Sequence, residues 1–111
     1  MNNLSATTML CTAMCSSFYP DEKAVEIALF NAGIVTNDEA QPRDKNIFMV
    51  AVLLVRGYVE SSRSEGGTSV SVDREAVEDA INFWANDFGV AEEDILPENT
   101  LRVVKDGSDL W

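Results

Sequence analysis

Nine consecutive apolar residues, Ile47 to Val55, stand near the middle of this 111-residue chain. The run is far too short to cross a bilayer. Further apolar residues follow it, so the whole segment is longer than an ordinary strand, and we predict a helix from Lys45 to about Ser61. A helix that is apolar on every side must be wrapped by its neighbours, in its own subunit or in an assembly. Gly57 would permit close packing or a kink within this helix.

Two helices are predicted before the apolar run. Residues 3 to 16 carry apolar side chains at roughly helical spacing, although Ser and Thr weaken the pattern. A second helix is indicated after Pro20, because Asp21 and Glu22 place negative charge in its first turn. It is expected to run to Ala32, where Gly33 can adopt the left-handed conformation that stops a helix. Residues 34–43 would form a loop.

The last predicted helix has the clearest pattern. Asp73 can cap its first turn, and Gly89 can end it. One stripe of its apolar residues is expected to face the core, and Trp84 is predicted to be an anchor of that core. The stripe consists of Val77, Ala80, Ile81, Trp84 and Phe88.

These elements predict a mainly α fold. We expect a small bundle of about four helices, with a short excursion of loop and β-strand before the last helix and an extended C-terminal arm. The polar, glycine-bearing loop would cover Ser61 to Thr68, and the strand would cover Ser69 to Val72. Residues 1–90 would form the helical domain and residues 91–111 the arm.

The charge balance excludes several classes of function. Acidic residues outnumber basic ones by 19 to 8, which gives a formal charge of -11. A chain of this charge is not a classical DNA or RNA reader, because phosphate binding depends on Lys and Arg. The sequence contains no His, the most common general base and a frequent zinc ligand. We therefore predict a protein that is not an enzyme, that holds no cofactor and no metal, and that acts by contacting other macromolecules.

Two groups of side chains could carry chemistry, but both are interpreted as structural. Glu75, Glu78 and Asp79 lie near the start of the last helix, where the helix dipole favours negative charge. Cys11 and Cys15 are four residues apart in a predicted helix, a spacing that does not suit a disulfide. We expect the cysteines to be small buried hydrophobic residues. Unpaired cysteines favour an intracellular, reducing origin, and the first twenty residues do not have the pattern of a signal peptide.

Two segments are candidates for contacts with other chains. The pair Gly66-Gly67 precedes a short amphipathic strand, an arrangement that can offer backbone hydrogen bonds to another chain or can simply connect two helices. At the C-terminus, Leu110 and Trp111 lie outside any periodic element, and Trp is frequent at the centre of interfaces. These two residues either dock onto a partner or fold back onto their own domain.

The segment Val59 to Ala76, VESSRSEGGTSVSVDREA, resembles part of the head-tail connector (adaptor, or head-completion) proteins of tailed bacteriophages and prophages. In that family a similar stretch leaves the long buried helix and enters the next one. The order of elements over residues 20–90 is also similar. The chain departs from the family pattern in its Ser/Thr-rich first helix and in its tail ending at Trp111.

The resemblance implies a structural virion protein in the neck between capsid and tail, assembled in the host cytoplasm. Copies would form a ring, typically dodecameric, that binds the portal protein and a tail or stopper protein, and DNA would pass through its channel without specific binding. The residues implied to contact a neighbouring subunit or the lumen of the channel are Arg63, Ser64, Glu65, Gly66, Gly67, Thr68, Ser69, Val70, Ser71 and Val72. Those implied to dock on the portal are Leu101, Arg102, Val103, Val104, Leu110 and Trp111.

A second hypothesis rests on charge alone. A formal charge of -11 in a chain of this length also suits an acidic inhibitor or DNA mimic that occupies the basic groove of a nucleic-acid enzyme. Such a protein should be a monomer or dimer whose binding weakens strongly with salt. The connector should instead assemble with a portal.

Overall fold

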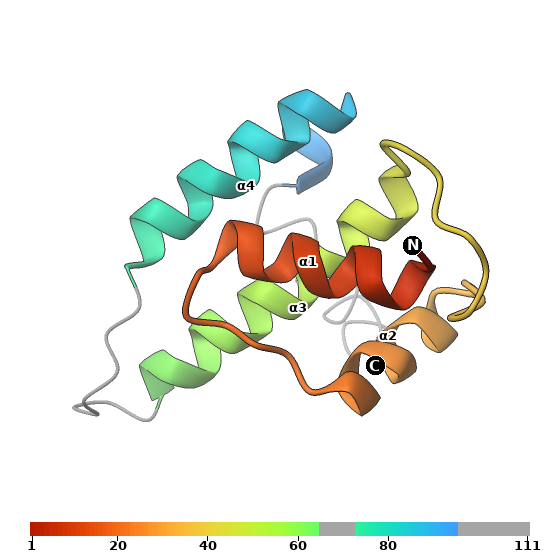
Figure 1. The fold of residues 1–111 in the computed structure, drawn as a ribbon. Helices are drawn as coiled ribbons and strands as arrows, with labels where there is room; N and C mark the ends of the chain where they lie inside the picture. The colour runs from red at the N-terminus through yellow and green to blue at the C-terminus, as the bar shows by residue number, and fades with distance from the viewer. Residues whose placement is uncertain (65–72, 96–111) are drawn as a thin grey trace, which may run out of the picture.

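A computed structural model describes residues 1–64 and 73–95 of the chain. Four α-helices follow one another: α1 (Asn3–Met14), α2 (Glu22–Asn31), α3 (Lys45–Ser64) and α4 (Arg74–Phe88). A short 3-10 helix, η1 (Glu92–Ile95), follows α4. The predicted mainly α bundle is confirmed (Figure 1). The predicted strand at Ser69 to Val72 and residues 96–111 of the predicted arm lie outside the described residues.

Helix α3 is the centre of the bundle and packs against α1, α2 and α4 (Figure 1). Its buried residues include Phe48, Val52 and Val55, each with no exposed surface. One side of α3 nevertheless reaches solvent, because the Leu53 side chain is 52% exposed. The bundle itself therefore does not cover this helix on every side, and cover by an assembly stays a prediction. A Cβ atom at Gly57 would meet nothing within 4 Å, so this glycine does not serve close packing inside the bundle.

The helix ends follow the capping residues that the sequence offers. The side chains of Asn2, Asp21 and Asp73 accept hydrogen bonds from backbone N–H groups in the first turns of α1, α2 and α4, at 2.9, 3.1 and 3.1 Å. Gly33 and Gly89 have φ angles of +77° and +72° after α2 and α4. Both glycines thus act as the left-handed helix stops that the sequence predicts.

Two predicted boundaries are corrected. Helix α1 ends at Met14, before the predicted position 16. Helix α3 runs to Ser64, beyond the predicted end near Ser61, so the backbone of Arg63 and Ser64 is helical and does not belong to the loop. Each residue added to an existing helix gains a backbone hydrogen bond, and neither Ser nor Arg stops helix growth. The first strong helix breakers in this region are Gly66 and Gly67.

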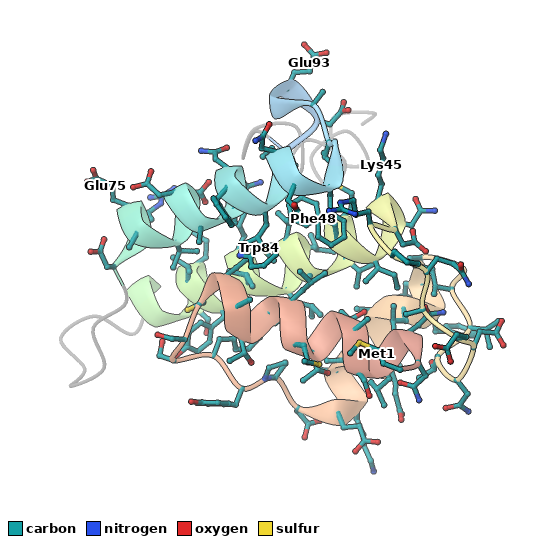
Figure 2. All side chains as sticks on the ribbon, turned by 45° about the horizontal axis from the view of Figure 1, so that its top comes forward. Met1, Lys45, Phe48, Glu75, Trp84 and Glu93 are labelled. Carbon is teal, nitrogen blue, oxygen red and sulfur yellow. The ribbon has the colours of Figure 1, made fainter. Side chains whose placement is uncertain are left out.

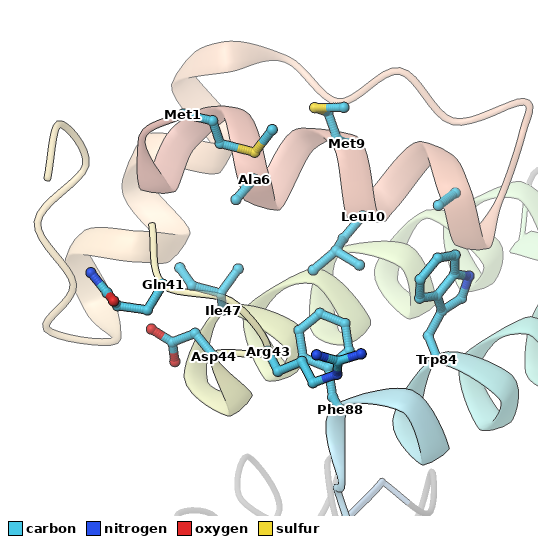
Figure 3. Close-up of a pocket in the computed structure, with 11 residues that line it drawn as sticks. Met1, Ala6, Met9, Leu10, Gln41, Arg43, Asp44, Ile47, Trp84 and Phe88 are labelled. Carbon is cyan, nitrogen blue, oxygen red and sulfur yellow. The ribbon is translucent and has the colours of Figure 1, made fainter. Parts of the chain in front are cut away.

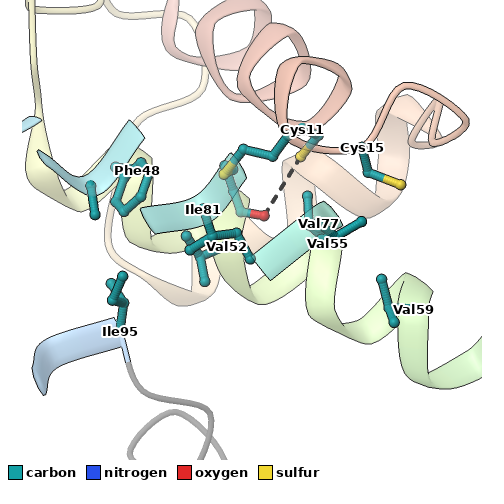
Figure 4. Packing of buried hydrophobic residues seen from close by; sticks show 12 residues of the cluster. Cys11, Cys15, Phe48, Val52, Val55, Val59, Val77, Ile81 and Ile95 are labelled. Atoms are coloured by element: carbon teal, nitrogen blue, oxygen red, sulfur yellow. Dashed lines mark hydrogen bonds between the residues drawn. The ribbon is translucent and has the colours of Figure 1, made fainter. Parts of the chain in front are cut away.

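The apolar side chains form two core clusters. The larger one lies where α1, α3 and α4 meet, and it includes Phe48, Val55, Ile81 and Ile95 (Figure 4). The smaller one lies between α2 and α3. Ile95 is only 1% exposed, so the packed unit continues past Val90 through η1.

Two polar residues of α1 face the interior. Thr7 is fully buried, and its hydroxyl donates to the carbonyl of Asn3 at 2.8 Å. The side-chain amide of Asn3 donates to the backbone carbonyl of Val35 at 2.8 Å, and this hydrogen bond holds the segment after α2 against the start of α1. Within the described residues, no buried side-chain nitrogen or oxygen lacks a partner. These two residues are therefore satisfied parts of the fold.

Candidate functional site

An open apolar groove of about 300 Å³ lies between α1, the start of α3 and the C-terminal half of α4 (Figure 3). Ala6, Leu10 and Ala13 of α1 form one wall. Their spacing of four and three residues places them on one helix face, and the two alanines leave room that larger side chains would fill. Met9 stands at the same wall with 58% of its surface exposed.

The opposite wall is aromatic and comes from α4. Trp84 and Phe88 are four residues apart and both line the groove. Phe88 stacks on Phe48 of α3 with ring centroids 5.1 Å apart, which fixes it to the core. The rings of Trp84 and Phe83 are perpendicular, with centroids 5.4 Å apart, and Phe83 is itself 66% exposed. The apolar surface of the groove therefore extends outward over Phe83.

The charged side chains of Arg43 and Asp44 stand at one end of the groove. The Arg43 Nε donates to the backbone carbonyl of Asp87 at 3.1 Å, and its guanidinium lies 3.6 Å from the Asp87 carboxylate. Lys45 is exposed, and its Cε lies near Gly89 at the end of α4. Asp44 also lines the groove, but its carboxylate accepts from the backbone N–H of Asn46 at 2.9 Å. The groove thus combines apolar walls with one cation, Arg43, which is paired with Asp87, and one carboxylate, that of Asp44.

The other groups that the sequence singled out have structural roles. Cys11 and Cys15 are both unpaired and buried, as predicted. Burial, with a smaller effect of neighbouring Cys15, raises the pKa of the Cys11 thiol from 9.0 to about 12. The Cys11 Sγ lies 3.8 Å from the carbonyl oxygen of Ala51 (Figure 4). A thiol with this pKa and no exposed surface is protonated and unreactive at neutral pH.

The carboxylates of α4 do not converge on a site. Glu78 forms a two-pronged ion pair with Arg56 of α3, with N···O distances of 2.8 and 3.1 Å. Glu75 and Glu93 point outward from opposite ends of the region formed by α4 and η1, whereas Phe48 and Trp84 point inward (Figure 2). Within residues 1–64 and 73–95, no cluster of Cys, Asp or Glu is placed to hold a metal ion.

Comparison with known protein families assigns the chain to one family. The model of DUF6706, a family of unknown function, matches residues 1–111. The chain belongs to the DUF6706 family. A search of the curated proteins gives no match, and a search of the solved structures gives none either.

Most of the interface residues predicted in this DUF6706 chain fall outside the described part. Only Arg63 and Ser64 are included, as the last turn of α3. The segments Glu65–Val72 and Leu101–Trp111 lie outside the described residues, so their contacts stay predictions. None of the described helices has both the length and the apolar character that a membrane span requires.

The groove of the DUF6706 chain is the feature that sequence reasoning missed. The sequence predicts Trp84 as a core anchor, and the residue does pack against the main cluster, but it is half-buried and also lines the groove. The signal for the opposite wall was the helical spacing of Ala6, Leu10 and Ala13. Arg43 could not have been assigned to the site, because only the fold brings its loop next to α4.

Proposed function

We propose that this protein is a structural subunit of a head-tail connector, which acts by binding copies of itself and a portal protein. One observation of the fold supports this proposal most directly. Large apolar side chains are exposed on α2 and on α4, which lie on opposite sides of the bundle (Figure 1), and Met9 of α1 and Leu53 of α3 are exposed as well. Contiguous exposed apolar patches often mark sites of interaction with other proteins.

The two surfaces differ in composition. On α2, Ile27 and Phe30 are 60% and 76% exposed and lie three residues apart on one helix face. On α4, the exposed Phe83 adjoins the groove. Two unlike faces on opposite sides of a subunit suit a head-to-tail contact, which closes into a ring when the rotation between subunits allows it. The segment from Val59 to Ala76 resembles the connector family. This resemblance is the reason why the proposal includes binding to the portal and a location in the virion neck.

The proposal is tested by mixing the purified protein with the portal protein of the genome that encodes it. We expect light scattering and electron microscopy to detect a ring on the portal. Phe30→Ser and Phe83→Ser should keep the helical circular dichroism and the melting temperature but lose ring formation. Asn82→Ser, a change at an exposed position beside Phe83, is the matched control and should still assemble.

Two results would contradict the proposal. One is a chain that stays monomeric or dimeric beside the portal while it inhibits a nuclease in a strongly salt-dependent manner, as the acidic-inhibitor hypothesis requires. The other is a source genome that encodes no portal protein. In either case the exposed apolar faces would serve another partner.

A further inference from the structure

One side of α3 is left uncovered by the bundle. Ala51 and Val55 are fully buried and mark the side of α3 that faces the core. At about 100° per residue, Leu53 lies on the opposite side of the helix, and its side chain is 52% exposed. Residues four and seven positions away along α3 share that side with Leu53. We call these residues the outer face of α3: Asn46, Met49, Leu53, Gly57 and Glu60.

Gly57 has no structural reason within the described part of its own chain. Its backbone is helical, a conformation that needs no glycine, and a Cβ atom there would meet nothing within 4 Å. Glycine inside a helix is nevertheless less favourable than alanine by about 1 kcal/mol. The missing side chain lowers the outer face beside Leu53, so a side chain of another molecule can approach the helix backbone closely.

The outer face is complementary to itself when its direction is reversed. Met49, which is half-buried, stands four residues before Leu53, and Gly57 stands four residues after it. Two copies of α3 can lie antiparallel with their Leu53 side chains in contact. Met49 of each copy then meets Gly57 of the other, and the flexible methionine side chain fills the space that the glycine leaves.

The polar and charged side chains match in the same register. Asn46 stands seven residues before Leu53, and Glu60 stands seven residues after it. The antiparallel pair brings the Asn46 amide and the ammonium group of neighbouring Lys45 to the Glu60 carboxylate of the other copy, twice by symmetry. Glu60 lies 3.6 Å from Arg74 of its own chain, but both side chains are half exposed, and a carboxylate accepts from more than one donor. A parallel pair would instead oppose lysine to lysine and glutamate to glutamate.

We infer that two copies of the chain associate through the outer faces of α3, antiparallel and related by a two-fold axis at Leu53. A two-fold contact joins the same surface of both partners, and the match of the outer face with itself is the reason to choose a second copy as its occupant. The contact covers the apolar side of α3 that the bundle leaves open. The inference goes beyond the connector proposal, which uses α2 and α4, and neither depends on the other.

Analytical ultracentrifugation of the full chain alone tests the association. We expect a reversible equilibrium of monomer and dimer between micromolar and millimolar concentration. Leu53→Lys places two like charges at the centre of the contact and should raise the dissociation constant about tenfold or more. Ile27→Lys is the matched control, because it changes the net charge equally at a side chain of α2 that is 60% exposed, and it should leave the constant unchanged. A chain that stays monomeric over this range, or equal weakening by both variants, would overturn the inference.

Exchange of charges tests the register. Lys45→Glu alone and Glu60→Lys alone each oppose like charges across the contact, so each variant should be monomeric at concentrations where the unchanged chain is dimeric. In their mixture every such contact joins Glu to Lys, and a one-to-one dimer should form. Lys23→Glu, the same change at an exposed lysine of α2, is the matched control and should stay dimeric. Failure of the mixture to form the dimer would overturn the inference.

A symmetric disulfide tests the position of the two-fold axis. Leu53→Cys should form a linked dimer on a non-reducing gel, whereas Ile27→Cys, at a similarly exposed position, should not; Cys11 and Cys15 are buried. Equal linking by both variants would mean unspecific collision and would contradict the contact. Thermal melting identifies the other possible cover. A monomer whose melting temperature falls with Leu53→Lys but not with Ile27→Lys would show that its own chain covers the outer face, and this result would also overturn the inference.

Discussion

Replacing Ile95 with alanine tests whether η1 belongs to the folded unit. Ile95 is 1% exposed and packs in the main cluster with Phe48 and Ile81. The change removes three buried carbon groups at about 0.8 kcal/mol each, or about 2.4 kcal/mol. The cavity left behind adds to this cost, and measured values for such changes are about 2 to 5 kcal/mol. Because η1 is one short turn that can relax, we expect a loss of about 2 to 3 kcal/mol.

The assay is urea denaturation followed by far-UV circular dichroism. Ile27→Ala is the matched control, because it makes the same chemical change at a side chain that is 60% exposed. We expect the control to change the free energy of unfolding by no more than about 0.5 kcal/mol. The slope with urea should be equal for both variants. If Ile95→Ala costs no more than Ile27→Ala, the packed unit ends near residue 90, as the sequence alone suggested.

Three further predictions follow from other contacts. Gly57→Ala should stabilise the protein by about 0.5–1 kcal/mol, because residue 57 is helical and has open space around it. Gly89→Ala should destabilise the protein by about 1–2 kcal/mol, because the φ angle of Gly89 is +72°. Thermal melting measures the sign of both changes. Glu78→Ala should cost about 1–3 kcal/mol in urea denaturation by removing both hydrogen bonds to Arg56, and an unchanged midpoint would contradict this. The pKa of the Cys11 thiol is about 12 in the folded protein and 9.0 in the unfolded chain, so the folded state favours the protonated thiol. The free energy of unfolding should therefore fall as the pH rises from 9.0 toward 12. Cys11→Ala should remove that part of the slope, and an equal slope in both proteins would disprove it.

Much of the fold could be predicted because its signals are local. Asp73 and Gly89 mark the two ends of α4, and hydrophobic spacing identifies its buried face. The sequence predicted less where the role of a residue depends on distant parts of the chain. The core-facing stripe of α1 includes Asn3 and Thr7, whose burial depends on hydrogen bonds that hydropathy does not reveal.

The candidate site was less accessible to sequence reasoning. Its walls come from α1, the loop before α3 and the end of α4, segments that are far apart in the chain. The exposure of Leu53 shows the same limit, because an unbroken apolar run does not reveal which side its neighbours leave uncovered.

The central place of α3 also determines how the domain opens. Helices α1, α2 and α4 all rest on α3, so the backbone amides near Val52 are covered from several directions. Exchange of these amide hydrogens with solvent deuterium therefore requires the whole bundle to unfold, whereas amides in the outer turns of α2 can exchange through local fraying. Loss of any one outer helix would uncover apolar surface on α3, and this shared surface makes the four helices a single cooperative unit.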